Sequence, residues 1–133
     1  MRPILFLHAF RFMGLSFLIP GVVAADLPAS FARPVAYGDL ATAVLAVLAL
    51  TMLSSKGSAL PIWLFNIVGT LDLLNAYYQG SRISVANAPG VLGATYFIPT
   101  LVVPLLLVTH ALVFRIMLRP QTAVIPQRLP HAA

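Results

Sequence analysis

Four apolar stretches, each long enough to cross a bilayer, constrain the fold of this chain more than any other feature. They cover about residues 3–25, 34–53, 59–78 and 91–118. A membrane-spanning helix needs about 20 consecutive, mostly apolar residues. In lipid the backbone must satisfy its own hydrogen bonds, which favours helices. We therefore predict an all-α membrane protein with four transmembrane helices in an antiparallel bundle with short loops.

Composition excludes an ordinary soluble domain. The 133 residues are 60% hydrophobic and 8% charged, whereas soluble domains carry about 25% charged residues. A soluble domain of roughly 150 residues buries only about 70% of its unfolded surface, so a chain this short cannot hide so much apolar area. The lipid bilayer is therefore the expected partner. Nucleic acid is not, because the basic residues behind the net charge of +5 are scattered beside the apolar stretches.

The connections between the stretches indicate one domain. Clusters that contain Gly and Ser lie at residues 54–58 and 79–82, and such clusters mark loops rather than helix interiors. We assign residues 1–119 to a four-helix transmembrane domain. Residues 120–133 contain three prolines and little apolar periodicity, which predicts a disordered cytoplasmic tail.

The first stretch could be a signal peptide, but its charge argues against removal. The apolar region of a signal peptide is about 7–15 uncharged residues long, and Arg11 lies inside this run. We therefore expect a retained helix.

Charge asymmetry predicts the orientation, because cytoplasmic loops carry an excess of Lys and Arg. With four spans, both termini share one side of the membrane. Six basic residues then fall on the side of the termini and two on the other, which places both termini in the cytoplasm: Arg2, Arg11, Lys56, Arg115, Arg119 and Arg128 against Arg33 and Arg82.

Arg11 and Asp72 are charged residues inside predicted spans. A charge at the bilayer centre costs about 2.5–3.5 kcal/mol on insertion scales, so such residues usually face the bundle interior and have a partner. Asp72, Asn75 and Gln79 are spaced i, i+3, i+7, which forms one polar stripe on a helix. We predict an intramembrane polar cluster in which Arg11 reaches this stripe.

This cluster has two interpretations. It can line a polar cavity that serves as a proton relay, an ion path or a ligand site. Alternatively, Arg11 and Asp72 form a buried structural ion pair that fixes the register of the helices, and this is the interpretation that we favour.

His8 and His110 lie on different predicted helices, both toward the cytoplasmic half of the membrane. Two such imidazoles can hold a haem iron axially in a helical bundle. We expect no cofactor, and haem b is the alternative that this pair of histidines leaves open. Alternatively, His110 hydrogen-bonds a neighbouring helix, for instance through Thr109 or Asn66.

Two further features concern helix geometry. Asp39 lies at the start of the second stretch, where a carboxylate favours the positive end of the helix dipole, so we predict a helix-start carboxylate. Pro99 and Pro104 lie in the fourth stretch, and each removes a backbone donor and tends to kink a helix.

Several chemistries have no signal in this sequence. The acidic residues are three aspartates far apart along the chain, and Cys and Glu are absent. There is also no glycine-rich phosphate loop and no metal-ligand spacing. We therefore expect neither an enzyme nor a metal site.

Short motifs support the interpretation of the chain as a small multi-pass membrane protein. The strings HAFRFMG at residues 8–14, LPASF at 27–31, GDL at 38–40, WLFN at 63–66 and LDLL at 71–74 resemble small multi-pass bacterial membrane proteins of uncharacterised function. The resemblance implies a location in the bacterial inner membrane and carries no activity or functional residue with it.

The expected role is that of a small integral inner-membrane protein without catalysis of its own. The first alternative is a minimal proton-coupled or small-solute transporter or channel subunit that forms a homo-oligomer, with Arg11, Asp72 and Asn75 on the path. The second is a haem-binding electron-transfer module. The sequence does not identify a small-molecule or ion ligand.

Overall fold

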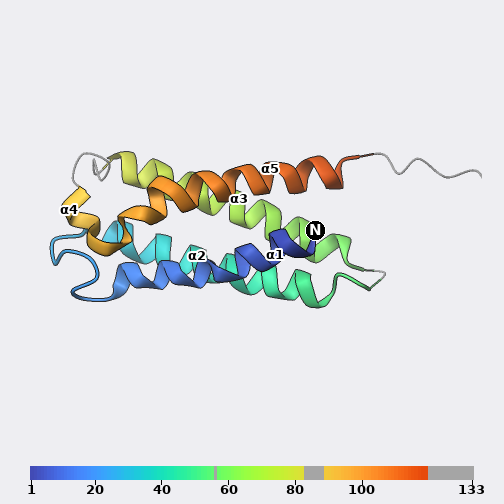
Figure 1. Ribbon diagram of the computed structural model, residues 1–133, viewed down its shortest axis with the longest axis horizontal. Coiled ribbons are helices and arrows are strands. Elements are labelled where there is room, and N and C mark those ends of the chain that lie inside the picture. Colours follow the sequence, from blue (N-terminus) through green and yellow to red (C-terminus); the bar gives the residue numbers. More distant parts are fainter. Residues whose placement is uncertain (56, 83–88, 120–133) are drawn as a thin grey trace, which may run out of the picture.

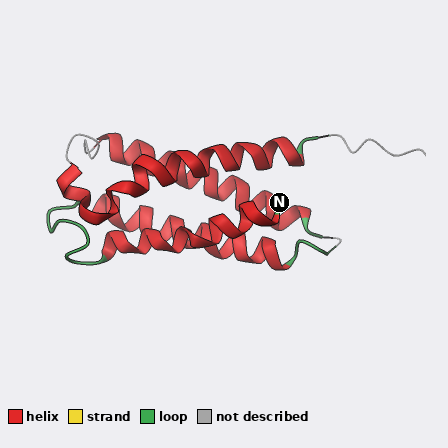
Figure 2. Cartoon of the chain, viewed as in Figure 1, coloured by secondary structure: helices red, strands yellow, loops and turns green. Residues whose placement is uncertain are grey.

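The computed structural model describes residues 1–55, 57–82 and 89–119, and this part of the chain is helical without a β-strand (Figure 2). The all-α prediction is thus confirmed, and the predicted tail at 120–133 lies outside the described residues. In chain order the elements are α1 (Arg2–Ala9), the 3-10 helix η1 (Phe10–Leu18), α2 (Ala29–Thr51), α3 (Ala59–Arg82), α4 (Pro89–Leu92), the 3-10 helix η3 (Gly93–Tyr96), the π-helix η4 (Ile98–Val102) and α5 (Val103–Met117).

Three helical segments are long and apolar enough to cross a membrane, namely Ala29–Thr51, Ala59–Arg82 and Ile98–Met117. Many large apolar side chains on them point outward. Leu60, Leu71, Leu101 and Val108 are each more than 60% exposed. A water-soluble surface rarely carries so much contiguous apolar area, so this exterior suits lipid.

The first predicted span is divided in the structure. The α-helical geometry of α1 continues directly into η1, and the helix ends where Ile19 is extended and Gly21 has a positive φ of 85°. The left-handed region is open to glycine because it lacks a Cβ. The chain therefore leaves the helix earlier than the predicted boundary near residue 25.

α2 begins at Ala29, earlier than the predicted start near residue 34, and Pro34 lies inside it. A proline often marks a helix boundary, which is why the second apolar stretch is predicted to start at Pro34. Neighbouring groups can satisfy the carbonyl that a proline frees in an apolar helix, so such a helix can continue through it.

The fourth predicted span contains a change of helix type. Pro99 lies in η4 and Pro104 in the first turn of α5. The Thr100 hydroxyl donates to the Tyr96 carbonyl at 2.8 Å, which satisfies one acceptor beside the irregular turn. A π-helical turn of this kind is often found at functional sites.

The long elements run side by side along one axis (Figure 1). α2 packs against α1, η1 and α3, and α5 packs against α3. The N-terminus and the end of α5 lie at one end of the molecule, while α4 and the loop before α2 lie at the other (Figure 1).

The interior has three layers along this axis. One apolar cluster lies toward the end that contains α4, and it includes Phe17, Phe31, Val35 and Ile98. A second lies toward the N-terminus and comprises Leu5, Ala46, Ala49, Ile62, Phe65 and Val113. Along each long element, a set of polar residues lies between the residues of the two apolar clusters. We call this set the polar layer, and it comprises His8, Arg11, Asp39, Thr42, Asn66, Asp72 and His110.

Candidate functional site

Arg11 is the centre of the polar layer. Its side chain is 1% exposed, on η1. Nε donates to Oδ1 of Asp39 at 2.7 Å, and Nη2 lies 2.7 Å from the same oxygen. Nη2 also donates to Oδ2 of Asp72 at 2.5 Å. One guanidinium therefore joins a carboxylate of α2 to a carboxylate of α3.

The far side of the guanidinium faces α3 and α5. Nη1 donates to the Gly69 carbonyl at 3.3 Å and lies 3.4 Å from Nε2 of His110. Because a guanidinium has donors only, this Nε2 acts as the acceptor, and the ring proton is on Nδ1. Nδ1 then donates to Oδ1 of Asn66 at 2.8 Å. The hydrogen bonds thus assign a neutral His110, and Arg11 contacts all three neighbouring helices.

His8 extends the layer on α1 and is fully buried. Its Nε2 lies 2.8 Å from Oγ1 of Thr109, whose own proton is donated to the Leu106 carbonyl at 2.9 Å. Nε2 of His8 is therefore the donor. Nδ1 of His8 and Nδ2 of Asn66 are buried and have no hydrogen-bond partner among the described residues.

The charges of the polar layer do not balance. Asp39 and Asp72 supply two carboxylates, and each side chain is only 10% exposed. Arg11 is the one cation that contacts them within the described residues. The hydrogen bonds assign a neutral His110, and Nδ1 of His8 is taken as unprotonated because it is buried without an acceptor and a buried charge without a partner is costly. With both aspartates ionised, the layer carries one surplus negative charge. A buried charge is costly, so a proton or a bound cation is needed to neutralise it.

Three glycines give these side chains the room that they occupy. A Cβ at Gly14 would overlap the Asp39 carboxylate, and a Cβ at Gly38 would overlap the Asp72 carboxylate. A Cβ at Gly69 would lie 2.5 Å from Cε1 of His110. The close approach of helices over small residues is common in membranes. Here each glycine accommodates one polar side chain of a neighbouring element.

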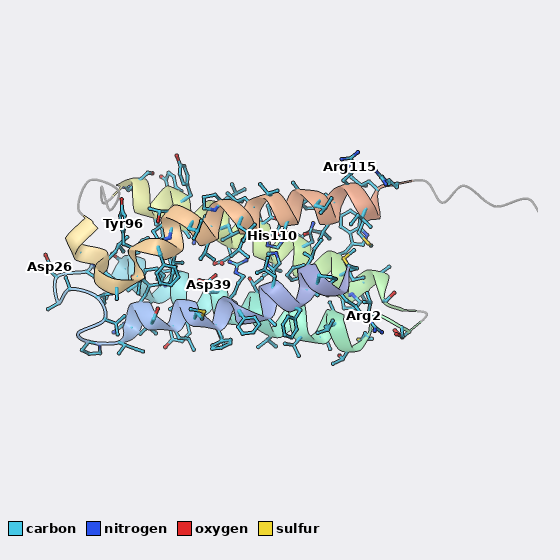
Figure 3. All side chains as sticks on the ribbon, viewed as in Figure 1. Arg2, Asp26, Asp39, Tyr96, His110 and Arg115 are labelled. Carbon is cyan, nitrogen blue, oxygen red and sulfur yellow. The ribbon has the colours of Figure 1, made fainter. Side chains whose placement is uncertain are left out.

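Two cavities border the layer. The larger has a volume of about 250 Å³ and lies among α2, α3 and the segment from η3 to α5, with Val35, Leu73 and Pro99 in its walls. The smaller has a volume of about 180 Å³ and lies between η1 and the segment from η4 to α5. Asp39 lines both cavities. Figure 3 shows Asp39 and His110 near the middle of the bundle, between the end with Arg2 and Arg115 and the end with Asp26 and Tyr96.

Only some residues of the predicted polar cluster lie together in the structure. Arg11 and Asp72 are in contact. Asn75 is exposed and Gln79 half-buried, and neither hydrogen-bonds to Arg11 in the described part of the chain. α3 instead turns Asn66 and Gly69 inward beside Asp72, so the polar stripe runs toward the N-terminus of α3 rather than toward its end.

The prediction for Asp39 is wrong. α2 begins well before it, at Ala29, so Asp39 lies inside the helix and away from the first turn. Its carboxylate binds Arg11 and is mostly buried. A signal for this was present, because Asp39 continues the line of small residues at 42, 46 and 49 that faces the neighbouring helices.

The two histidines do not fit axial ligation of one haem iron. Their ring centroids are 4.3 Å apart, so the rings contact each other and leave no space for a macrocycle between them. Nε2 of each ring is already bonded, to Thr109 in one case and to Arg11 in the other. The residues 1–55, 57–82 and 89–119 also hold no group of three His, Cys, Asp or Glu side chains that could bind a metal.

Comparison with known families adds a classification. A model of a domain of unknown function, DUF8737, matches residues 1–118. The chain belongs to the DUF8737 family. This match covers the polar layer and both cavities. No curated protein and no solved structure matches the chain.

Proposed function

We propose that this DUF8737 protein is a non-catalytic integral protein of the bacterial inner membrane with four membrane-spanning segments. Three of these segments are the long apolar helices described above, and the remaining one, nearest the N-terminus, is formed by α1 and η1. At rises of roughly 1.5 Å and 2.0 Å per residue, these two elements together reach about 30 Å. This equals the thickness of the hydrocarbon core, about 30 Å. The 3-10 geometry of η1 thus lets a short segment cross the bilayer.

Both termini are proposed to face the cytoplasm. Arg2 and Arg115 lie at the end of the bundle that holds the N-terminus, and Asp26 lies at the opposite end (Figure 3). An excess of basic residues favours the cytoplasmic side.

The orientation can be tested with single cysteines, because the chain has none of its own. Ser54 follows the end of α2 and Ser81 lies in the last turn of α3, and both are exposed. These two helix ends lie at opposite ends of the bundle (Figure 1), so Ser54→Cys and Ser81→Cys place one thiol at each end. In intact spheroplasts, a membrane-impermeant maleimide should label Ser81→Cys and spare Ser54→Cys until the membrane is opened. The reverse pattern would place the termini outside.

The function that the geometry supports best is a structural one. The observation that supports this role most directly is that the Arg11 side chain alone contacts α2, α3 and α5. Buried ionic groups of this kind can specify one arrangement of helices among many similar apolar packings.

The structural role predicts that Arg11 determines the uniqueness of the fold. Arg11→Met should give a protein that still inserts in the membrane but loses its defined packing, seen as broadened methyl NMR spectra in nanodiscs. The exposed Arg2→Met is the matched control. Sharp, unshifted spectra for Arg11→Met would contradict the proposal.

A second candidate function is proton-coupled transport of a small solute. It is favoured by the surplus carboxylate of the polar layer, because Asp39 borders both cavities and needs a proton or a cation for neutrality. Intramembrane carboxylates frequently mark proton and substrate pathways. In proteoliposomes with an internal pH dye, a solute-driven proton flux that Asp39→Asn abolishes would support this role. A flux unchanged by Asp39→Asn would refute it.

A homo-oligomer is the partner that we propose. Asn75 is exposed on α3 among the apolar side chains of Leu71 and Leu74. A polar side chain on a lipid-facing surface gains hydrogen bonds when a second helix packs against it.

A further inference from the structure

The larger cavity has apolar walls and one charged group. Aromatic rings of Phe17, Phe31 and Tyr96 contribute to its lining, and Phe17 and Phe31 pack edge to face with centroids 6.0 Å apart. Asp39 is the one charged residue among the described residues that line it. Such a cavity provides a site for an apolar body with one polar end.

The sign of that polar end follows from the charges around Asp39. The carboxylate shares Arg11 with Asp72, so one guanidinium serves two carboxylates. Arg11 lines the smaller cavity and is absent from the walls of the larger one. His110, which also faces Arg11, does not line the larger cavity either. The wall of the larger cavity therefore contains the acidic residue Asp39, while the guanidinium of Arg11 lines the smaller cavity.

The volume limits the size of the ligand. A cavity of about 150 Å³ holds a benzene molecule. By proportion, 250 Å³ gives room for about ten non-hydrogen atoms. The aromatic walls favour a cation, because an ammonium is attracted to the face of an aromatic ring. A single aromatic ring with a short aminoalkyl arm has this size and this charge.

We propose that the larger cavity binds a small lipophilic monoamine in its protonated form, with the ammonium group at Asp39 and the apolar body between Phe17, Phe31 and Tyr96. The ligand supplies the positive charge that the polar layer lacks. This inference shares Asp39 with the transport candidate but does not depend on transport, since it concerns binding at equilibrium.

Three probes of similar size test the role of charge. 2-Phenylethylamine, 2-phenylethanol and phenylacetate differ in the charge at the end of the arm and carry the same ring. Calorimetric titration of the protein in nanodiscs, with empty nanodiscs subtracted, should show saturable binding of one amine per chain. The alcohol should bind at least tenfold more weakly, and phenylacetate should not bind. Equal binding of amine and alcohol would overturn the proposal and identify the cavity as a pocket for lipid chains. Absence of amine binding would also overturn it.

Two variants locate the site. Asp39→Asn should remove the advantage of the amine over the alcohol. Ala76 lines the larger cavity, so Ala76→Phe should fill the cavity and abolish binding of both while leaving the polar layer intact. Ala111→Phe, on the exposed face of α5, is the matched control and should bind the amine as the wild type does.

Retention of the amine preference in Asp39→Asn, or of amine binding in Ala76→Phe, would refute the assignment. If Asp39→Asn does not fold, the three probes and the comparison of Ala76→Phe with Ala111→Phe still test whether the larger cavity binds the amine. A protein that binds the amine but carries no proton flux would separate this inference from transport.

Discussion

The surplus carboxylate makes the effect of Asp72→Asn depend on whether Arg11 is present. In the wild-type protein, Asp72 accepts one hydrogen bond from Nη2 of Arg11, while Asp39 is engaged by both Nε and Nη2. Replacing Asp72 by Asn leaves the contact between Arg11 and Asp39 and restores neutrality. The guanidinium of Arg11 stays charged, so its bond to the new amide oxygen remains charge-assisted and lies near the lower end of the range of about 1.5–3 kcal/mol for hydrogen bonds to charged groups. The expected loss in free energy of unfolding is therefore about 1 kcal/mol.

Arg11→Gln has a different effect, because it leaves two buried carboxylates without their cation. Removal of one partner from a buried ion pair costs about 3–5 kcal/mol. In that background, Asp72→Asn removes one of the stranded charges and should stabilise the protein. The double variant should therefore be more stable than Arg11→Gln alone. The change in free energy of unfolding caused by Asp72→Asn thus has opposite signs in the wild-type and Arg11→Gln backgrounds.

The assay is reversible unfolding by SDS in mixed micelles, with the four proteins of the double-mutant cycle measured together. Arg2→Gln is the control for loss of a positive charge, because Arg2 is exposed and its hydrogen bond to Ser54 is long at 3.4 Å. A surface change of this type should stay within about 0.5 kcal/mol. If Asp72→Asn destabilises both backgrounds by the same amount, the two residues are not coupled and the assigned network is wrong.

Three further predictions concern other contacts. Gly14→Ala should lower the free energy of unfolding by about 1–3 kcal/mol because the new methyl group displaces the Asp39 carboxylate; Gly57→Ala, which meets nothing within 4 Å, should be neutral in the same SDS titration. Asn75→Leu should reduce chemical cross-linking of the protein to itself in native membranes, and unchanged cross-linking would exclude α3 from the oligomer contact. Protein that is incubated with haem and then freed of unbound haem by gel filtration should show no Soret band, because the contacting rings of His8 and His110 leave no space for the macrocycle; a Soret band lost in a histidine variant would contradict this geometry.

Part of this architecture was predictable from hydropathy and charge alone. Long apolar stretches require helices in lipid, and a charge inside such a stretch must face the interior, where Arg11 and Asp72 are found. The type of helix was not predictable, because the change from α1 to the 3-10 geometry of η1 has no counterpart in the apolar periodicity. Helix boundaries near Pro34 and Ile19 also depend on neighbouring groups.

The site was harder to predict than the fold because it depends on rotation about the helix axis. Asn75 and Gln79 share a polar stripe with Asp72 in the sequence, yet α3 is turned so that Gly69 contacts Arg11 and Asn66 contacts His110 instead. Asp39 was assigned to a helix start because the true start at Ala29 lies before a proline. The glycines could not be assigned either, since their role becomes visible only when the side chains of neighbouring elements are placed.

The position of Arg11 in η1, ahead of both of its aspartate partners in the chain, has a consequence for how the protein is made. Asp39 follows it by 28 residues and Asp72 by 61. At a synthesis rate of about 5–20 residues per second, Arg11 is without Asp39 for roughly 1–6 s and without Asp72 for roughly 3–12 s. During the first interval, the leading helix carries an unpaired positive charge that lipid does not tolerate well. The smallest nascent unit with a neutral interior is the pair formed by η1 and α2. Biogenesis should therefore deliver these two segments to the membrane together, and the later helices should join a hairpin that is already neutral.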